Sequence, residues 1–217
     1  MKRSELIRNI LGEVGYKEGP NNDNKYGKWF GLNHQPWCCI LQIWNIYLCG
    51  GANLVKKTAS CGSLYSWAMA KGYLTNNPLP GDLMIMTFTK SKPHAHTGLV
   101  IGRDNSGAVI CVEGNTAPDS KGSQDNGDGV YIKKRPLRYI HSIIRLPFRE
   151  EYITVRNTRQ ITVWTAPGKK DEYRSRVIDP QTITVCKTLI PSITSEGDTF
   201  YRTMKGAYVL SKYCKEV

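Results

Sequence analysis

HTGLVIGRDNSGAVICVEGNT, residues 96–116, holds two apolar segments on either side of the turn-forming residues RDNSG. Each segment has the length and composition of a short strand, so we predict an antiparallel hairpin. The start of its first strand and the end of its second strand must then lie at one end of the hairpin. We therefore expect His96 and Glu113 to lie close together. Alternation along the second strand places Asn115 on the same face as Glu113.

The rest of the first two thirds of the chain predicts helices followed by strands. Helical patterns cover residues 4–15, with Ser4 as the N-cap, residues 36–49 before Gly50-Gly51, and residues 63–71. Further strand patterns are DLMIMTF, GVYIKK and YIHSIIRL. The polar residues before the second helix, GPNNDNKYGKWFGLNHQ, are predicted to form a loop. This order is typical of an α+β fold, with N-terminal helices packed on one side of an antiparallel sheet.

Residues 153–217 form a second region, in which only strand patterns recur. Pro and Gly separate the segments ITVRNT, QITVWTA, SRVI, TITVCKTL, TFYRTM and AYVLSKY. This rhythm predicts a small all-β barrel. We thus expect two domains, at residues 1–148 and 153–217.

Composition limits the class of protein. The 217 residues contain seven cysteines without a CxxC pair and carry a net charge of +12. We see no secretion signal and no apolar run of the ~18 residues that span a membrane. We therefore expect reduced thiols in a protein made in a cytoplasm. The charge favours a polyanionic partner, but no nucleic-acid-binding motif accompanies it.

The adjacent cysteines at the start of the second helix are candidate nucleophiles. A helix N-terminus stabilises a thiolate, and an imidazole can exchange its proton. Cys39 lies in helical phase with Ile43 and Ile46, which predicts a buried side chain. Cys38 lies in phase with the more polar Gln42 and Asn45, which predicts that it reaches a cleft. His96 could supply the imidazole from a rigid strand, and Glu113 or Asn115 could orient it.

Five segments in this order, YGKWFG, PWCC, PGDLMIM, HTGLVIG and VEGNT, resemble the CHAP domain. This is a family of Cys/His-dependent amidohydrolases and peptidases that cut peptidoglycan and are similar to papain in plan. The resemblance covers roughly residues 1–148. It implies that Cys38 is the nucleophile and His96 the base, that Glu113 orients the imidazole, and that Asn115 completes the polar cluster.

Three neighbouring residues are candidates for substrate binding. Gln35 could donate a second hydrogen bond to the oxyanion, His94 could line the cleft, and Trp37 could form a cleft wall or belong to the core. Some CHAP domains bind calcium before the cysteine, but here that loop has the single carboxylate Asp23, and calcium prefers more. We assign no metal and expect no cofactor, with calcium as the one ion to consider.

The second region resembles a bacterial SH3-type wall-binding domain through TVWTAPG, RVI and GAYV. Its aromatic and basic residues could line a ligand groove, namely Tyr173, Arg174, Arg176, Tyr201 and Tyr208.

Together these resemblances imply a peptidoglycan hydrolase similar to bacteriophage endolysins, held in the host cytoplasm until it reaches the wall. It would be an amidase or an endopeptidase, with peptidoglycan and anionic wall polymers as partners, no nucleic acid and no membrane span. The alternatives are a bacterial or mobile-element wall-remodelling hydrolase, a non-catalytic wall-binding module with a degenerate site, and a nucleic-acid-binding protein driven by charge.

Overall fold

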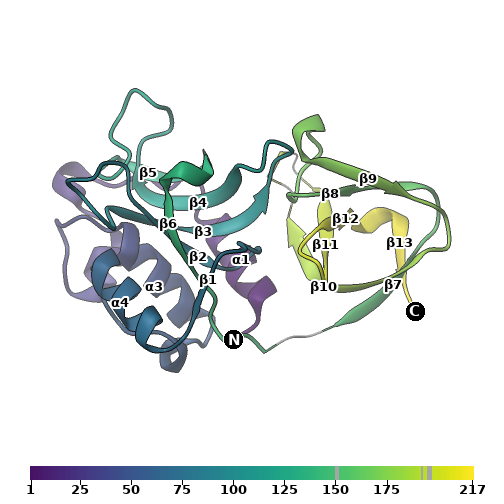
Figure 1. The fold of residues 1–217 in the computed structure, drawn as a ribbon, viewed down its shortest axis with the longest axis horizontal. Coiled ribbons are helices and arrows are strands. Elements are labelled where there is room, and N and C mark those ends of the chain that lie inside the picture. Colours follow the sequence, from purple (N-terminus) through teal and green to yellow (C-terminus); the bar gives the residue numbers. More distant parts are fainter. Residues whose placement is uncertain (150–151, 192, 195–196) are drawn as a thin grey trace.

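The structure, a computed structural model, describes residues 1–149, 152–191, 193–194 and 197–217. These residues form a mixed α and β fold with two antiparallel sheets. Figure 1 shows the sheets side by side, with the α-helices gathered on the first one. No helix in this described part is long and apolar enough to cross a membrane. The seven cysteines are all free thiols.

The helices follow the sequence prediction with two differences. Their bounds are α1 Arg3–Gly12, α2 Lys25–Phe30, α3 Cys38–Leu48 and α4 Cys61–Ala70. Helix α1 begins before Ser4, which is buried inside it, and Lys2 occupies the N-cap position, so the predicted Ser4 cap is wrong. Helix α2 was predicted as loop. It forms because the Asn24 side chain accepts a hydrogen bond from the Gly27 backbone N–H and caps its start.

The first sheet contains the predicted hairpin. Its strands are β1 Leu74–Thr75, β2 Leu83–Met86, β3 His96–Arg103, β4 Val109–Thr116, β5 Gly129–Arg135 and β6 Ile140–Ile144. They lie in the order β1-β6-β2-β3-β4-β5, and all neighbours pair antiparallel. The α+β prediction, with helices and an antiparallel sheet in the N-terminal part, is confirmed at this level. Short 3₁₀ helices at Pro20–Asn22, Ala52–Leu54 and Leu137–Tyr139 connect the elements.

One glycine lets the start of α3 pack directly against β4. A Cβ atom at Gly114 would lie 2.5 Å from Leu41 Cδ2 and 2.5 Å from a ring carbon of Trp37. Only a residue without a side chain permits this approach. Gly114 therefore sets the position of the α3 N-terminus, and of Cys38, relative to the strand that carries Glu113.

The second sheet contains only strands and short 3₁₀ turns. The strands are β7 Ile153–Asn157, β8 Ile161–Trp164, β9 Arg174–Ile178, β10 Ile183–Pro191, β11 Thr199–Thr203, β12 Tyr208–Leu210 and β13 Cys214–Glu216, with 3₁₀ turns at Asp171–Tyr173 and Ser211–Tyr213. Their order is β13-β7-β10-β11-β12-β8-β9. Among the described residues the outermost strands β13 and β9 do not pair, so the sheet is not closed by hydrogen bonds into the predicted barrel.

The two sheets share a continuous apolar core. Ile101 of β3 and Phe200 and Tyr208 of the second sheet belong to one buried cluster. The buried Tyr208 hydroxyl donates a 2.6 Å hydrogen bond to the Ile101 carbonyl oxygen. The change of sheet falls between β6 and β7, and the division into domains at 148 and 153 stays a prediction.

This contact also corrects the expected ligand groove of the second sheet. Tyr208, Tyr173 and Tyr201 are buried, so none of these rings offers an open face to a ligand. The side chains of Arg174 and Arg176 are exposed as expected.

Gly102, where the two sheets meet, gives a test of this packing. A Cβ atom there would lie 2.5 Å from the Thr165 carbonyl oxygen and 2.7 Å from Ala166 Cβ. We expect Gly102→Ala to lower the free energy of unfolding by about 1–3 kcal/mol, because backbone must move to accept the methyl group. Denaturant unfolding measures it. The control is Gly12→Ala, whose Cβ would meet nothing within 4 Å and which should not destabilise. Equal stability of the two variants would contradict the close contact.

Candidate active site

Cys38 is the first residue of α3, directly after the N-cap residue Trp37. The first N–H groups of a helix have no partner inside it, and the helix dipole adds positive potential there. The Cys38 side chain is 6% exposed, whereas Cys39 is fully buried and its Sγ donates to the Thr58 carbonyl oxygen at 3.4 Å. The two neighbouring thiols therefore have different surroundings, and Cys38 is the one with a path to solvent.

The polar stripe that favoured Cys38 in the sequence is, however, buried. Gln42 donates to the Val112 carbonyl oxygen at 3.3 Å, and Asn45 donates to the Leu6 carbonyl oxygen at 3.1 Å. Both side chains are fully buried. The interpretation of this stripe as facing a cleft was wrong, since its amides satisfy backbone groups of β4 and α1 instead.

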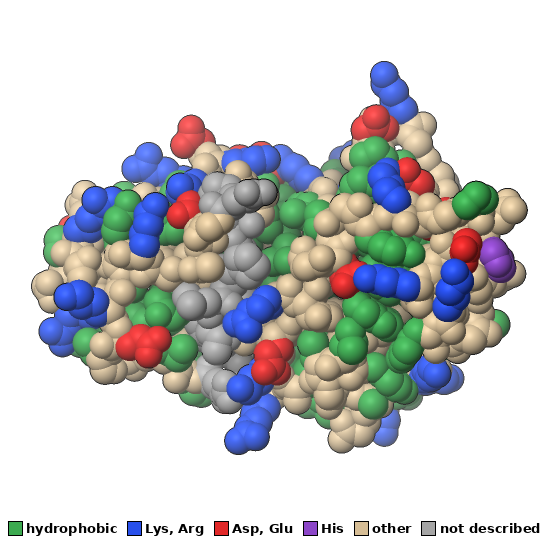
Figure 2. Space-filling model, turned by 180° about the vertical axis from the view of Figure 1, so that it is seen from behind, with side chains coloured by type: hydrophobic (Ala, Val, Ile, Leu, Met, Phe, Trp, Pro, Cys, Tyr) green, Lys and Arg blue, Asp and Glu red, His purple; other side chains and the backbone are tan. Residues whose placement is uncertain are grey.

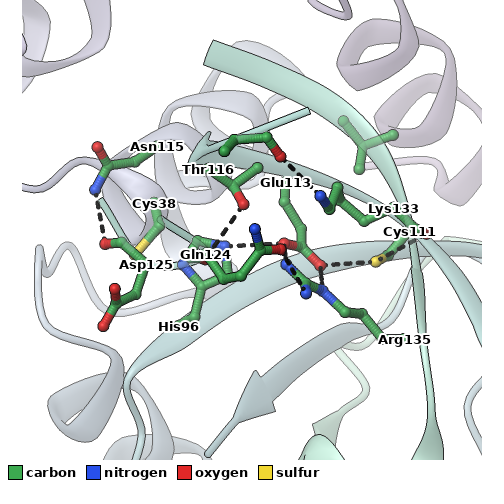
Figure 3. Close-up of polar contacts among 12 residues, drawn as sticks. Cys38, His96, Cys111, Glu113, Asn115, Thr116, Gln124, Asp125, Lys133 and Arg135 are labelled. Carbon is green, nitrogen blue, oxygen red and sulfur yellow. Dashed lines mark hydrogen bonds and ion pairs between the residues drawn. The ribbon is translucent and has the colours of Figure 1, made fainter. Parts of the chain in front are cut away.

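His96 begins β3 and lies beside Cys38, as Figure 3 shows. Its Nε2 is 3.1 Å from Glu113 Oε2, and both side chains are fully buried. The predicted proximity of His96 and Glu113 across the hairpin is thus observed. With Nε2 engaged by the carboxylate, the buried Nδ1 has no hydrogen bond of good geometry within the described residues. The imidazole is fixed in orientation, and one nitrogen remains for proton exchange with the thiol.

Arg135, the last residue of β5, holds the Glu113 carboxylate. Its Nε donates to Oε1 at 2.7 Å and one of its terminal nitrogens donates to Oε2 at 2.5 Å, a bidentate pair in a buried setting. The Cys111 thiol also donates to Oε1, at 3.0 Å. Burial raises the pKa of Glu113, but the hydrogen bonds from Arg135 and His96 outweigh it and lower this pKa to about 2. Glu113 is therefore a carboxylate at neutral pH.

The charge on Glu113 acts in turn on the imidazole and the thiol. Burial lowers the pKa of His96, but Cys38 and Glu113 raise it to about 9. The contact with Cys61 and burial hold the pKa of the Cys38 thiol well above its usual range, and His96 lowers it only in part. A thiol, an imidazole and a carboxylate in this order can perform nucleophilic catalysis, with the proton passing between sulfur and imidazole.

Asn115 lies near this cluster but bonds elsewhere. Its backbone has a positive φ of 56°, which turns the end of β4, and its side-chain amide donates to the Asp125 carbonyl oxygen at 3.1 Å. The structure thus brings Cys38, His96 and Glu113 together. The side chain of Asn115 instead bonds to the loop before β5. The catalytic role of each residue stays a prediction.

The three residues predicted for substrate binding have different surroundings. Trp37 is fully buried, stacks on Tyr26 with ring centroids 5.2 Å apart, and donates its indole N–H to Glu18, so it belongs to the core and forms no cleft wall. Gln35 is exposed in the loop before Cys38. His94 is half-buried and stacks on Tyr65 at 4.5 Å.

The loop considered for calcium is held by other contacts. Asp23 Oδ1 pairs with Lys28 Nζ at 2.7 Å and accepts a hydrogen bond from Asn33 Nδ2 at 2.6 Å. Within the described residues no group of three or more His, Cys, Asp or Glu side chains is placed to hold a metal ion.

Comparison with known proteins gives few matches. No family model matches the chain, and no curated protein does. Among solved structures it is similar to a crystal structure of Ly7917 and to one of Ly7917 with the hydrolyzing product of MDP, with TM-scores of 0.43 and 0.42 and 15% identity to each. Both alignments cover 100% of this chain and 98% of the other. Similarity this low assigns neither a fold family nor a function.

The low pKa of Glu113 predicts that the free energy of unfolding falls at acid pH. Its pKa is about 2 in the folded chain and near the ordinary 4.5 when unfolded. Stability from this carboxylate is complete above pH 4.5 and is lost as the pH falls through about 2, because the unfolded chain binds the proton first. We expect a loss of about 3 kcal/mol over this window.

Urea unfolding between pH 5 and about pH 2 measures this loss, and Glu113→Gln should remove it. The control is Glu172→Gln, which alters an exposed carboxylate 3.3 Å from Lys134 and should keep the wild-type slope. An unchanged slope in Glu113→Gln would contradict the strong pairing of Glu113.

Proposed function

We propose that this protein is a cysteine-dependent hydrolase that cuts an amide bond in the peptide part of bacterial peptidoglycan, as a CHAP-type enzyme. The observation that carries the proposal is the placement of Cys38 at a helix N-terminus beside His96, whose ring is held by the Arg135-paired Glu113. The ordered motifs of the sequence give the substrate class. No cofactor enters the proposal.

The proposed reaction is acyl transfer through Cys38. The thiolate attacks the amide carbonyl carbon while His96 carries the proton taken from sulfur. The negative charge on the carbonyl oxygen is stabilised by N–H groups at the start of α3. His96 then protonates the leaving amine, and an acyl-thioester remains on Cys38. Water, deprotonated by His96, attacks the thioester carbonyl carbon, and the C–S bond breaks. The Cys38 sulfur takes the proton back from His96, and the product acid leaves the site.

Two adjoining hollows are lined by residues that neighbour this cluster, and they support the proposal. One, of about 470 Å³, is lined by Pro36, Lys92, Pro93, Ala95, Asp125 and Asn126. It lies next to the site along the chain, because Pro36 precedes Cys38 by two residues and Ala95 adjoins His96. The other, of about 780 Å³, shares Lys92, Ala95 and Asp125 and extends to Arg135. Basic and acidic side chains in both suit a peptide that carries amino and carboxylate groups.

We further propose that residues 153–217 bind the wall as an SH3-type domain and that residues 1–148 are the catalytic domain. A hollow of about 420 Å³ in the second sheet includes the exposed apolar side chains of Ile183 and Met204 and the basic Arg176 and Lys205. This mixture suits a sugar-peptide polymer with anionic groups. Nucleic acid is less well supported, since Lys and Arg are scattered over the face in Figure 2 and form no continuous patch there.

Replacement of each adjacent cysteine tests the assignment of the nucleophile. We expect Cys38→Ala to lower the rate of wall lysis about a thousandfold or more, because alanine has no sulfur to form the thioester beside His96. Cys39→Ala should stay within about threefold of wild type, since its sulfur contacts Thr58 rather than His96. Turbidity of purified walls measures both, and circular dichroism confirms folding. Full lysis by Cys38→Ala would show that Cys38 is not the nucleophile.

Glu113→Gln tests the electrostatic part of the mechanism. The carboxylate raises the pKa of His96, so its loss should lower that pKa and move the alkaline limb of the activity profile to lower pH. We expect kcat to fall about tenfold to a hundredfold as well. Rates between pH 5 and 10 measure both effects. An unchanged alkaline limb would show that Glu113 does not set the charge of His96.

The bond that is cut can be identified from the products. Mass spectrometry of digested purified wall distinguishes an amidase, which frees the peptide from the sugar, from an endopeptidase, which leaves new termini within the peptide or cross-bridge. We expect product release to continue in the presence of a metal chelator, because the proposed reaction uses no cofactor.

A further inference from the structure

A second cysteine from a distant part of the chain lies against Cys38. Cys61 is the first residue of α4, and its Sγ is 3.8 Å from the Sγ of Cys38. Both thiols are free, and each residue is 6% exposed. No pattern in the sequence predicts this contact, since 22 residues separate the two positions. The proposed mechanism leaves Cys61 without a role.

The geometry favours bond formation between these two sulfurs. A disulfide needs the sulfurs about 2.05 Å apart, so they must approach by roughly 1.8 Å from their van der Waals contact. Rotation of the two side chains about their χ1 torsions can supply such a movement. Both residues begin an α-helix, where the dipole favours a thiolate, and His96 lies beside Cys38. Contacts with neighbouring thiols and burial oppose this effect and hold the pKa of both thiols above its usual range. Cys39, which also lies close to Cys61, directs its thiol to Thr58.

We propose that Cys61 is a resolving cysteine, which forms a disulfide with Cys38 after a peroxide has oxidised the Cys38 thiol. In the first step the Cys38 thiolate attacks one oxygen of hydrogen peroxide, the O–O bond breaks, and a sulfenic acid and hydroxide form. In the second step the Cys61 thiolate attacks the Cys38 sulfur, and the S–O bond breaks. The hydroxide leaving group takes up a proton as water. In sum, two thiols and one peroxide give one disulfide and two waters.

The disulfide would switch off the nucleophile reversibly. A sulfenic acid that meets no second thiol is oxidised further to a sulfinic acid, which thiols do not reduce. With Cys61 in contact, the intermediate is trapped as a disulfide that a dithiol reduces. Hydrogen peroxide is small enough to enter the hollow lined by Pro36 and Ala95, which neighbour Trp37 and His96 in the sequence. The effect on activity rests on the proposed function, whereas disulfide formation does not.

Peptide mapping of the peroxide-treated full chain tests the bond itself. Trypsin places Cys38, Cys39 and Cys49 in the peptide 29–56 and Cys61 in the peptide 58–71. We expect a cross-linked pair of these peptides, lighter by two hydrogens than their sum, in wild type, in Cys39→Ala and in the control Cys49→Ala. It should be absent from Cys38→Ala and from Cys61→Ala. A cross-link that persists in Cys38→Ala would overturn the proposal, as would a wild-type Cys38 found as sulfinic acid without any cross-link.

Recovery of activity provides a second readout. Peroxide should lower the lysis rate of wild type at least tenfold, and dithiothreitol should restore it. Untreated Cys61→Ala should lyse walls at a rate within a few-fold of the wild-type rate. After peroxide its loss of activity should persist in dithiothreitol, because Cys38 is then a sulfinic acid, heavier by two oxygens. Equal recovery in both would overturn the resolving role. If untreated wild type fails to lyse walls, the proposed function fails, while the cross-link still decides the role of Cys61.

Discussion

The bidentate ion pair between Arg135 and Glu113 is the interaction on which the candidate site depends. A buried carboxylate without a partner would cost several kcal/mol or take up a proton. Arg135 keeps it ionised, and it is itself held by Gln124, whose Oε1 accepts from it at 3.0 Å. The ionised carboxylate then fixes the ring of His96 next to Cys38. A chain of contacts thus runs from β5 through β4 and β3 to the start of α3, and each side chain orients the next one.

Part of this chain could be predicted from the sequence, and part could not. The hairpin of residues 96–116 places His96 near Glu113 because strand polarity alone decides which ends meet. Arg135 was missed because a long polar loop separates β4 from β5, and alternation does not give the register between strands joined in that way. Cys61 was missed because the contact between the first residues of α3 and α4 has no local signal. In both cases a contact between distant segments of the chain decides the chemistry.

Local patterns also misled in ways that have a physical explanation. The buried amides of Gln42 and Asn45 satisfy backbone carbonyls, so a polar stripe on a helix can face a sheet rather than a cleft. Trp37 lies next to the candidate nucleophile Cys38 in sequence, yet Gly114 leaves room for its ring inside the core. The polar loop that contains α2 holds a helix because a single Asn caps it. The structure of such segments thus depends on the hydrogen-bond partners of their polar groups, which composition does not reveal.

The hydrogen bond from Tyr208 to Ile101 bears on how this protein can be dissected. Ile101 and His96 both lie on β3, so the second sheet contacts the same strand that positions the imidazole. Cutting the chain near residue 150 would uncover apolar surface on both halves and leave the phenol without its acceptor. We therefore expect neither half to be readily exchanged for an unrelated domain. A chimaera that grafts a different module onto residues 1–148 would need to supply a replacement for this tyrosine and for the apolar surface around it.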